Sequence, residues 1–116
     1  MIHKIEGNYI ARITYTNFNT KTKKISIDYG NAIYKIEKIY EHEFLVEANI
    51  LSSKKIINLL FFEDSNGFTS ASSTNSIDRM FFNDNILIHN WSNQIDSNGI
   101  IINGRAELEN ACVKCN

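Results

Sequence analysis

The chain has 116 residues, with 43% hydrophobic residues, 22% charged residues and a formal net charge of −1. This length suits one domain with its own core, and the composition is that of a folded globule, not of a disordered or fibrous chain. The near-neutral charge argues against direct binding of nucleic acid, because nucleic-acid-binding domains usually carry a basic excess.

Neither a targeting segment nor a membrane span is visible in the sequence. Residues 1–6 reach charged side chains at once and lack the apolar stretch of a signal peptide, and no apolar run of about eighteen residues occurs. We therefore expect a cytoplasmic protein with no membrane partner. The heavy use of Ile, Asn and Lys resembles the product of an AT-rich microbial accessory gene, and we expect a bacterial protein.

Alternation of apolar and polar residues predicts the first two strands. We expect them over residues 9–16 and 24–29, with a lysine-rich turn between them. Gly30 and Asn31 tolerate positive φ and are expected to end the second strand. Residues 32–40 fit either a helix or a strand, and their β-branched content favours the strand.

The centre of the expected sheet is a buried hairpin. Residues 44–51 and 55–62 are two apolar runs of β-favouring residues, and a polar break at 52–54 separates them. We therefore place this hairpin in the middle of a larger sheet.

The second half of the chain continues the pattern. Residues 68–76 fit a weak edge strand or an open loop. Further strands are expected over residues 77–82, 86–92 and 100–102. Asn103 and Gly104 are expected to form a turn or bulge, and residues 105–110 to form a closing strand or a short helix.

These segments give about eight or nine short strands, spaced about ten residues apart. The predicted fold class is therefore all-β: a single-domain antiparallel meander over residues 1–110, closed as a barrel or layered as a sandwich. Strand order and oligomeric state stay open. Residues 111–116 are expected to fray as a C-terminal tail.

Two short motifs resemble the calycin group of β-barrels, the lipocalins and fatty-acid-binding proteins. Gly7-Asn8-Tyr9 opens the first strand, where those families have Gly-x-Trp. Gly104-Arg105 opens the closing strand, where they place an arginine that packs over the tryptophan. Tyr9 replaces the tryptophan, and the chain is shorter than a typical lipocalin. The resemblance implies an inner cavity for an apolar ligand, although a barrel of about eight strands can also be filled by its own side chains.

Few residues suggest metal or redox chemistry. Cys112 and Cys115 have C-x-x-C spacing, but a structural zinc needs four ligands and a redox pair normally begins a helix. His42 lies between two glutamates on an extended segment, where neighbouring side chains point to opposite sides, so the three do not converge on a metal. His89 and Trp91 share one strand face, and we expect them half-buried at a sheet edge in preference to lining a pocket.

The sequence also lacks the patterns of a catalytic site. The serines have no nucleophile elbow around them, the glycines form no phosphate loop, and the paired carboxylates fit a solvated surface. We therefore expect a protein that is not an enzyme and that has no catalytic residue, metal or other cofactor.

Binding is then the expected function. The first hypothesis is a small cytoplasmic inhibitor or immunity-type protein that occludes the active site of a partner protein, such as a bacterial toxin or nuclease. Its candidate contacts are aromatic and acidic side chains: Tyr40, Glu41, Glu43, Glu63, Asp64 and Trp91.

The second hypothesis is a calycin-like carrier of a small apolar ligand. Its pocket would be lined by Tyr9, Ile13, Tyr15, Ile27 and Phe44. A third hypothesis is a subunit whose edge strand completes a larger sheet or a dimer.

Overall fold

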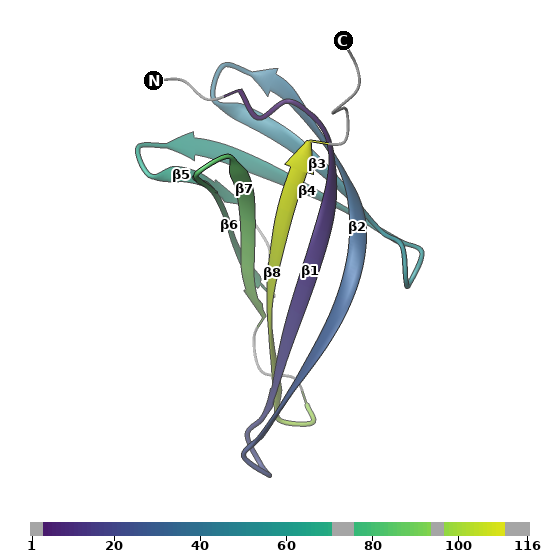
Figure 1. Ribbon diagram of the computed structural model, residues 1–116. Coiled ribbons are helices and arrows are strands. Elements are labelled where there is room, and N and C mark those ends of the chain that lie inside the picture. Colours follow the sequence, from purple (N-terminus) through teal and green to yellow (C-terminus); the bar gives the residue numbers. More distant parts are fainter. Residues whose placement is uncertain (1–3, 71–75, 94–96, 111–116) are drawn as a thin grey trace.

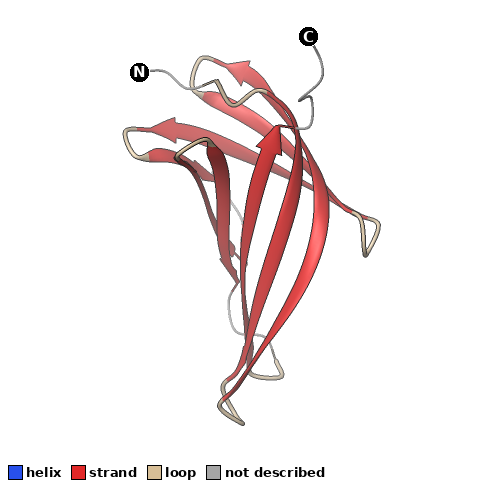
Figure 2. Ribbon diagram, viewed as in Figure 1, coloured by secondary structure: helices blue, strands red, loops and turns tan. Residues whose placement is uncertain are grey.

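The structure is a computed structural model and describes residues 4–70, 76–93 and 97–110. Within these ranges all regular secondary structure is β (Figures 1 and 2). The strands are β1 (Gly7–Asn19), β2 (Lys24–Tyr40), β3 (Glu43–Ile50), β4 (Lys55–Asp64), β5 (Gly67–Ser70), β6 (Ser76–Asn83), β7 (Ile86–Asn93) and β8 (Ile100–Asn110).

Each strand pairs antiparallel with its neighbour in sequence, and β8 pairs with β1. The β1–β8 ladder joins Tyr9 to Asn110 at one end and Asn19 to Ile100 at the other. The predicted all-β antiparallel meander is thus confirmed. Because the last strand returns to the first, the molecule is a closed barrel, not a sandwich.

The expected hairpin of residues 44–51 and 55–62 is confirmed as β3 and β4, although in a closed barrel no hairpin is central. Two other expectations are wrong: the end of the second strand at Gly30 and the turn or bulge at Gly104. β2 runs through Gly30 without a break, and β8 runs through Gly104. A Cβ atom at Gly104 would overlap the ring of Trp91, and one at Gly30 would lie 3.3 Å from Tyr15 Cε2. These glycines therefore leave room for aromatic rings that cross the strands, and they do not turn the chain.

The same two continuous strands settle the segments for which a helix was an alternative. Residues 32–40 are strand, as their β-branched content favoured. Residues 105–110, for which a strand and a short helix were both open, are also strand. Residues 67–70 form the short β5, and the expected turn before β2 occupies residues 20–23, with Lys23 at φ 62°.

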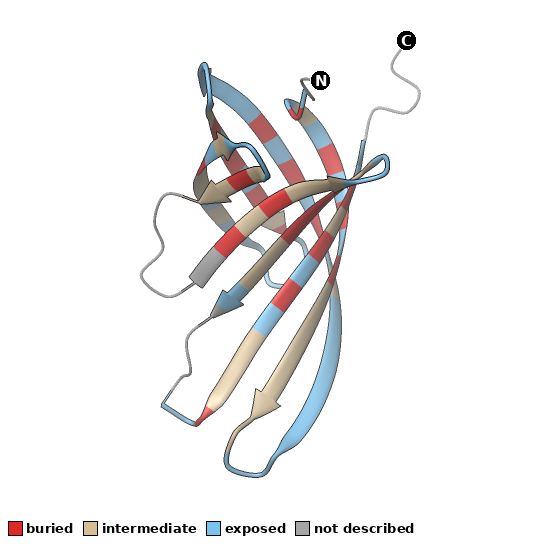
Figure 3. Ribbon diagram, turned by 90° about the vertical axis from the view of Figure 1, so that its left-hand side faces the viewer, coloured by how far each residue is buried: buried red, intermediate tan, exposed pale blue. Residues whose placement is uncertain are grey.

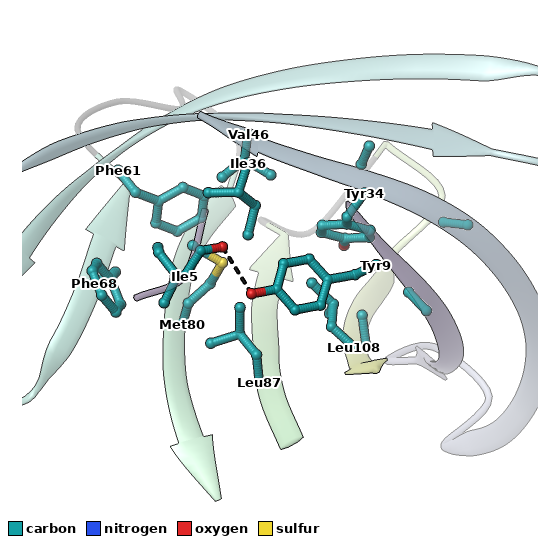
Figure 4. Packing of buried hydrophobic residues seen from close by; sticks show 14 of the residues in the cluster. Ile5, Tyr9, Tyr34, Ile36, Val46, Phe61, Phe68, Met80, Leu87 and Leu108 are labelled. Carbon is teal, nitrogen blue, oxygen red and sulfur yellow. Dashed lines mark hydrogen bonds between the residues drawn. The ribbon is translucent and has the colours of Figure 1, made fainter. Parts of the chain in front are cut away.

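Apolar side chains fill one half of the barrel interior. Figure 3 colours the buried residues along the strands. They alternate with outward side chains along every long strand and include Ile36, Phe44, Val46, Phe61, Phe68, Met80, Leu87 and Leu108. Ile5, which precedes β1, is also fully buried among them (Figure 4). The Tyr9 hydroxyl donates a hydrogen bond to the Ile5 carbonyl oxygen over 2.8 Å. The segment before β1 therefore closes this end of the barrel.

The arginine contact that the calycin resemblance implies does not form. Gly7 begins β1 and Tyr9 is buried, as expected. Arg105, however, lies opposite Thr14, and its guanidinium Nε is 3.8 Å from Glu107 Oε2. Tyr9 is instead opposite Asn110. The structure supports the barrel, but not this family-specific contact.

Candidate functional site

The second half of the barrel interior holds a cavity of about 430 Å³. Its lining includes Ser53 and Lys55 beside the β3–β4 turn, and Asn17 and Asp28 of the β1–β2 hairpin. Figure 1 shows where these two hairpins end. The cavity lining includes aromatic, aliphatic and polar side chains: Tyr15, Asn17, Asp28, Tyr34, Ala48, Ile50, Ser53, Lys55, Ile57, Leu59, Asp78, His89, Trp91 and Ile102. All long strands contribute, so the cavity exists only in the closed barrel.

Tyr15 and Trp91 form one wall of this cavity. Both lie opposite Gly104, Tyr15 from β1 and Trp91 from β7. Their rings meet edge to face with centroids 6.0 Å apart, a favoured arrangement for aromatic pairs. The absence of a side chain at Gly104 lets the Trp91 ring lie across β8, so this glycine shapes the cavity wall.

A chain of buried polar side chains forms the floor, between the cavity and the apolar core. The Tyr34 hydroxyl lies 2.7 Å from His89 Nδ1, and His89 Nε2 lies 2.9 Å from Asp78 Oδ1. The exposed fractions are only 1% for Tyr34 and 4% for both His89 and Asp78. Such groups need partners when they are buried, and here each is a partner of the next.

The order of donors along this chain follows from the carboxylate. A carboxylate oxygen accepts, so the histidine tautomer that carries its proton on Nε2 donates to Asp78. In that tautomer Nδ1 is an acceptor and takes the hydrogen bond of the Tyr34 hydroxyl. This tautomer satisfies all three groups, with Tyr34 donating to His89 and His89 donating to Asp78.

Aromatic rings fix the orientation of the histidine. The Tyr34 and Phe61 rings meet the His89 ring edge-on, each with centroids 5.7 Å from it. The Trp91 ring lies closer, at 4.9 Å and tilted by 41°. Contacts on several sides leave the imidazole little freedom to rotate, so both its hydrogen bonds are held in place.

Burial also determines what Tyr34 can do chemically. Loss of solvent raises the pKa of the Tyr34 hydroxyl far above 10.0, and the negative charge of Asp78 raises it further. A hydroxyl that keeps its proton is a poor nucleophile and a poor base. It is suited to hydrogen bonding.

The rim of the cavity is polar. Asn17 Nδ2 donates to Asp28 Oδ2 over 3.1 Å, and Lys55 and Ser53 also line the cavity. An apolar wall with a few fixed polar groups is the usual composition of a small-molecule site. This arrangement can enclose an apolar body and bind a polar group at the floor or the rim.

The structure separates the predicted partner contacts into two places. Tyr40, Glu41, Glu43, Glu63 and Asp64 gather around the β2–β3 and β4–β5 turns, at the barrel end away from the cavity (Figure 1). Trp91 lies in the cavity wall instead.

His42 belongs to this turn cluster. Its Nδ1 lies 3.2 Å from Glu63 Oε1, and its carbonyl accepts from the Glu63 backbone N–H over 2.8 Å. The glutamate in contact with His42 is thus Glu63 of β4. Across the described ranges, no group of three or more metal-binding side chains occurs.

Sequence reasoning located some cavity residues and missed others. Of the expected pocket residues, only Tyr15 lines this cavity; Tyr9, Ile13 and Phe44 are in the filled core, and Ile27 faces outward. The expected sheet-edge position for His89 and Trp91 is wrong, because both point into the barrel. Cys112 and Cys115 lie outside the described residues.

Tyr34 and Asp78 were not singled out. The available signal was position: Asp78 is two residues before Met80, which is an inward-facing residue of the same strand. A carboxylate in register with core residues indicates a buried polar site.

Comparison with known proteins finds no family model that matches the chain and no curated protein that matches it significantly. In the part of the chain that the structure covers, no helix has the length and apolar character needed to span a membrane.

Proposed function

We propose that this chain is a cytoplasmic, non-catalytic binding protein that carries a small, mostly apolar ligand inside its barrel, as calycins do. The observation that carries this proposal is the cavity of about 430 Å³ with the Tyr34–His89–Asp78 chain as its floor. Ligand pockets commonly have volumes of about 300–1,000 Å³.

The polar floor supports recognition in preference to turnover. The Tyr34 proton is engaged by His89, and the His89 Nε2 proton is engaged by Asp78. The same donor order occurs in nucleophile–histidine–carboxylate triads. Burial, and not the donor order, favours recognition, because Tyr34 is only 1% exposed and the raised pKa of its hydroxyl makes the oxygen a weak nucleophile. The Tyr34 oxygen keeps a lone pair that can accept a hydrogen bond from a ligand group.

Ligand binding can be tested with the purified chain. Native mass spectrometry is expected to show a retained small molecule, and the neutral probe N-phenyl-1-naphthylamine is expected to bind with a change in the fluorescence of Trp91, the only tryptophan. Ala48→Leu adds volume inside the cavity and is expected to weaken probe binding at least about tenfold.

Asn49→Leu is the matched control. It adds the same side chain at the next position of β3, which faces out of the barrel, and is expected to leave binding unchanged. Equal binding by Ala48→Leu and wild type, or no binding by wild type, would argue against a ligand in this cavity.

A second candidate function is the inhibitor or immunity-type protein. Its specific support is the turn cluster, where Tyr40 is widely exposed beside the carboxylates of Glu41, Glu43, Glu63 and Asp64. The backbone N–H of Asn66 donates to Asp64 and lowers the pKa of that carboxyl, so it is charged at neutral pH. Such an end could enter the cationic cleft of a nuclease.

The test of this candidate uses the product of a neighbouring toxin gene as the binding partner. Glu41→Lys with Glu43→Lys is expected to slow association, most strongly at low salt, because steering depends on charge. Lys54→Glu, in the β3–β4 turn at the other end, is the control. Association rates that do not respond to the glutamate changes would remove this candidate.

A further inference from the structure

Part of β2 lies at a free edge of the barrel wall. β1 pairs with β2 along residues 24–36, whereas β3 pairs with β2 only from Ala32 onward. Among the residues that the structure describes, 24–30 therefore have a strand neighbour on one side only. Figure 1 shows this part of the hairpin extending beyond β3, and Figure 3 colours most of it as exposed.

The hydrogen bond nearest to this edge shows which residues point their backbone N–H and C=O groups toward it. The Asn31 carbonyl accepts from the Leu51 N–H over 3.0 Å, so Asn31 points its backbone groups to the β3 side. Backbone direction alternates along a strand. Tyr29, Ile27 and Ile25 therefore present their N–H and C=O groups to the free edge.

The same three residues carry apolar side chains on the outer face. The exposed fractions are 65% for Ile25, 52% for Ile27 and 77% for Tyr29. Phe18 of β1 lies beside Ile25 and extends this apolar row. A long apolar edge with free backbone groups is a template for a further strand.

We propose that this edge binds the same edge of a second copy of the chain. The two strands run antiparallel around a two-fold axis at Ser26. Lys24 then lies opposite Asp28 of the second copy, and Asp28 lies opposite the second copy's Lys24. Ile25 lies opposite Ile27 of the second copy, where their backbone groups exchange hydrogen bonds and their side chains meet.

The charges of Lys24 and Asp28 favour this register over the registers with the two-fold axis at a nearby residue. An axis at Lys24 or at Asp28 would place two like charges directly opposite each other, which is unfavourable. An axis at Ile25 or Ile27 would leave Lys24 and Asp28 opposite uncharged residues. The Ser26 axis alone pairs both charges of each copy, and it does so within the strand, which begins after Lys23 at φ 62°.

Charge reversal gives a test that separates pairing from folding. Sedimentation velocity over about a hundredfold concentration range is expected to show a monomer–dimer equilibrium for the wild type. Lys24→Asp and Asp28→Lys, each alone, create like-charge pairs and are expected to weaken the dimer at least about tenfold.

Mixing the two single variants is the decisive arm. In the mixed dimer, the Lys24→Asp copy carries an acidic side chain at both positions and the Asp28→Lys copy carries a basic one at both. Every pair between the copies is therefore again of opposite charge, and the mixture is expected to associate about as well as the wild type. Association on mixing also shows that both variants are folded. A wild type that stays monomeric, or a mixture that does not associate, overturns the proposal.

Amide exchange locates the contact independently of the cavity. In the dimer, the N–H groups of Ile25 and Ile27 are expected to gain protection as concentration rises. The N–H groups of Ser26 and Asp28 already face β1 and are expected to change little. Equal protection at all concentrations would place any association elsewhere and overturn this assignment.

Discussion

His89 Nε2 lies 2.9 Å from Asp78 Oδ1, and both side chains are almost completely buried. The β6–β7 ladder sets this contact, because it places Asp78 opposite Trp91 and His89 opposite Met80 on the same inner face. The pair thus lies on diagonal positions of one hairpin. This local pairing holds the histidine at the boundary between the filled core and the cavity.

Removing the carboxylate is expected to destabilise the barrel. Asp78→Ala leaves the buried His89 N–H without this acceptor, which costs about 1–3 kcal/mol. Asp78→Asn keeps an oxygen acceptor at the same place and is expected to cost less. Urea unfolding measures both changes. Equal stability of Asp78→Ala and wild type would show that the contact contributes nothing.

Replacing Gly104 by alanine is expected to destabilise the barrel, although alanine has the smallest side chain. In Gly104→Ala the new Cβ would overlap the Trp91 ring, so the ring must shift, at a cost of about 1–3 kcal/mol. Gly30→Ala is the graded control, since its Cβ would lie 3.3 Å from Tyr15 Cε2 and needs a smaller adjustment. Trp91 fluorescence and thermal unfolding report both effects. A larger effect at Gly30 would contradict this prediction.

Stability is expected to fall at alkaline pH, in part because of Tyr34. Burial raises its pKa above 10.0, so near and above pH 10 the unfolded chain loses this proton while the folded chain keeps it. The unfolded state then binds fewer protons, and the free energy of unfolding falls by up to about 1.4 kcal/mol per pH unit for this group. Below that range both states keep the proton, so the group adds no pH dependence to the stability.

Tyr34→Phe isolates this contribution. The variant loses the hydrogen bond to His89 and is expected to be about 1 kcal/mol less stable at pH 7. Its stability should then fall less steeply above pH 10 than that of the wild type. Parallel pH profiles for the two proteins would refute the assignment to Tyr34.

The segment before β1 is expected to be part of the core. Ile5→Ala removes a fully buried side chain and should cost about 2–5 kcal/mol, as for other buried isoleucines. Ile10→Ala, on the outer face of β1, is the control and is expected to cost much less. Similar unfolding midpoints for the two variants would mean that Ile5 does not close the barrel.

The sequence by itself determined the strands, because alternation of apolar and polar residues is a local property. It predicted the hairpin of β3 and β4 and the hairpin of β6 and β7 close to their observed bounds. It failed at Gly30 and Gly104, since a glycine in a turn and a glycine beneath an aromatic ring look alike in one dimension.

Only the tertiary structure decided that the sheet closes and what its interior contains. Closure depends on the pairing of β1 with β8, which are far apart in the chain. The site depends on Tyr34 meeting His89 across 55 residues, and on the filling of one half of the interior but not the other. Strand register around the whole barrel decides which inward side chains from distant strands meet. No local pattern in the sequence fixes that register.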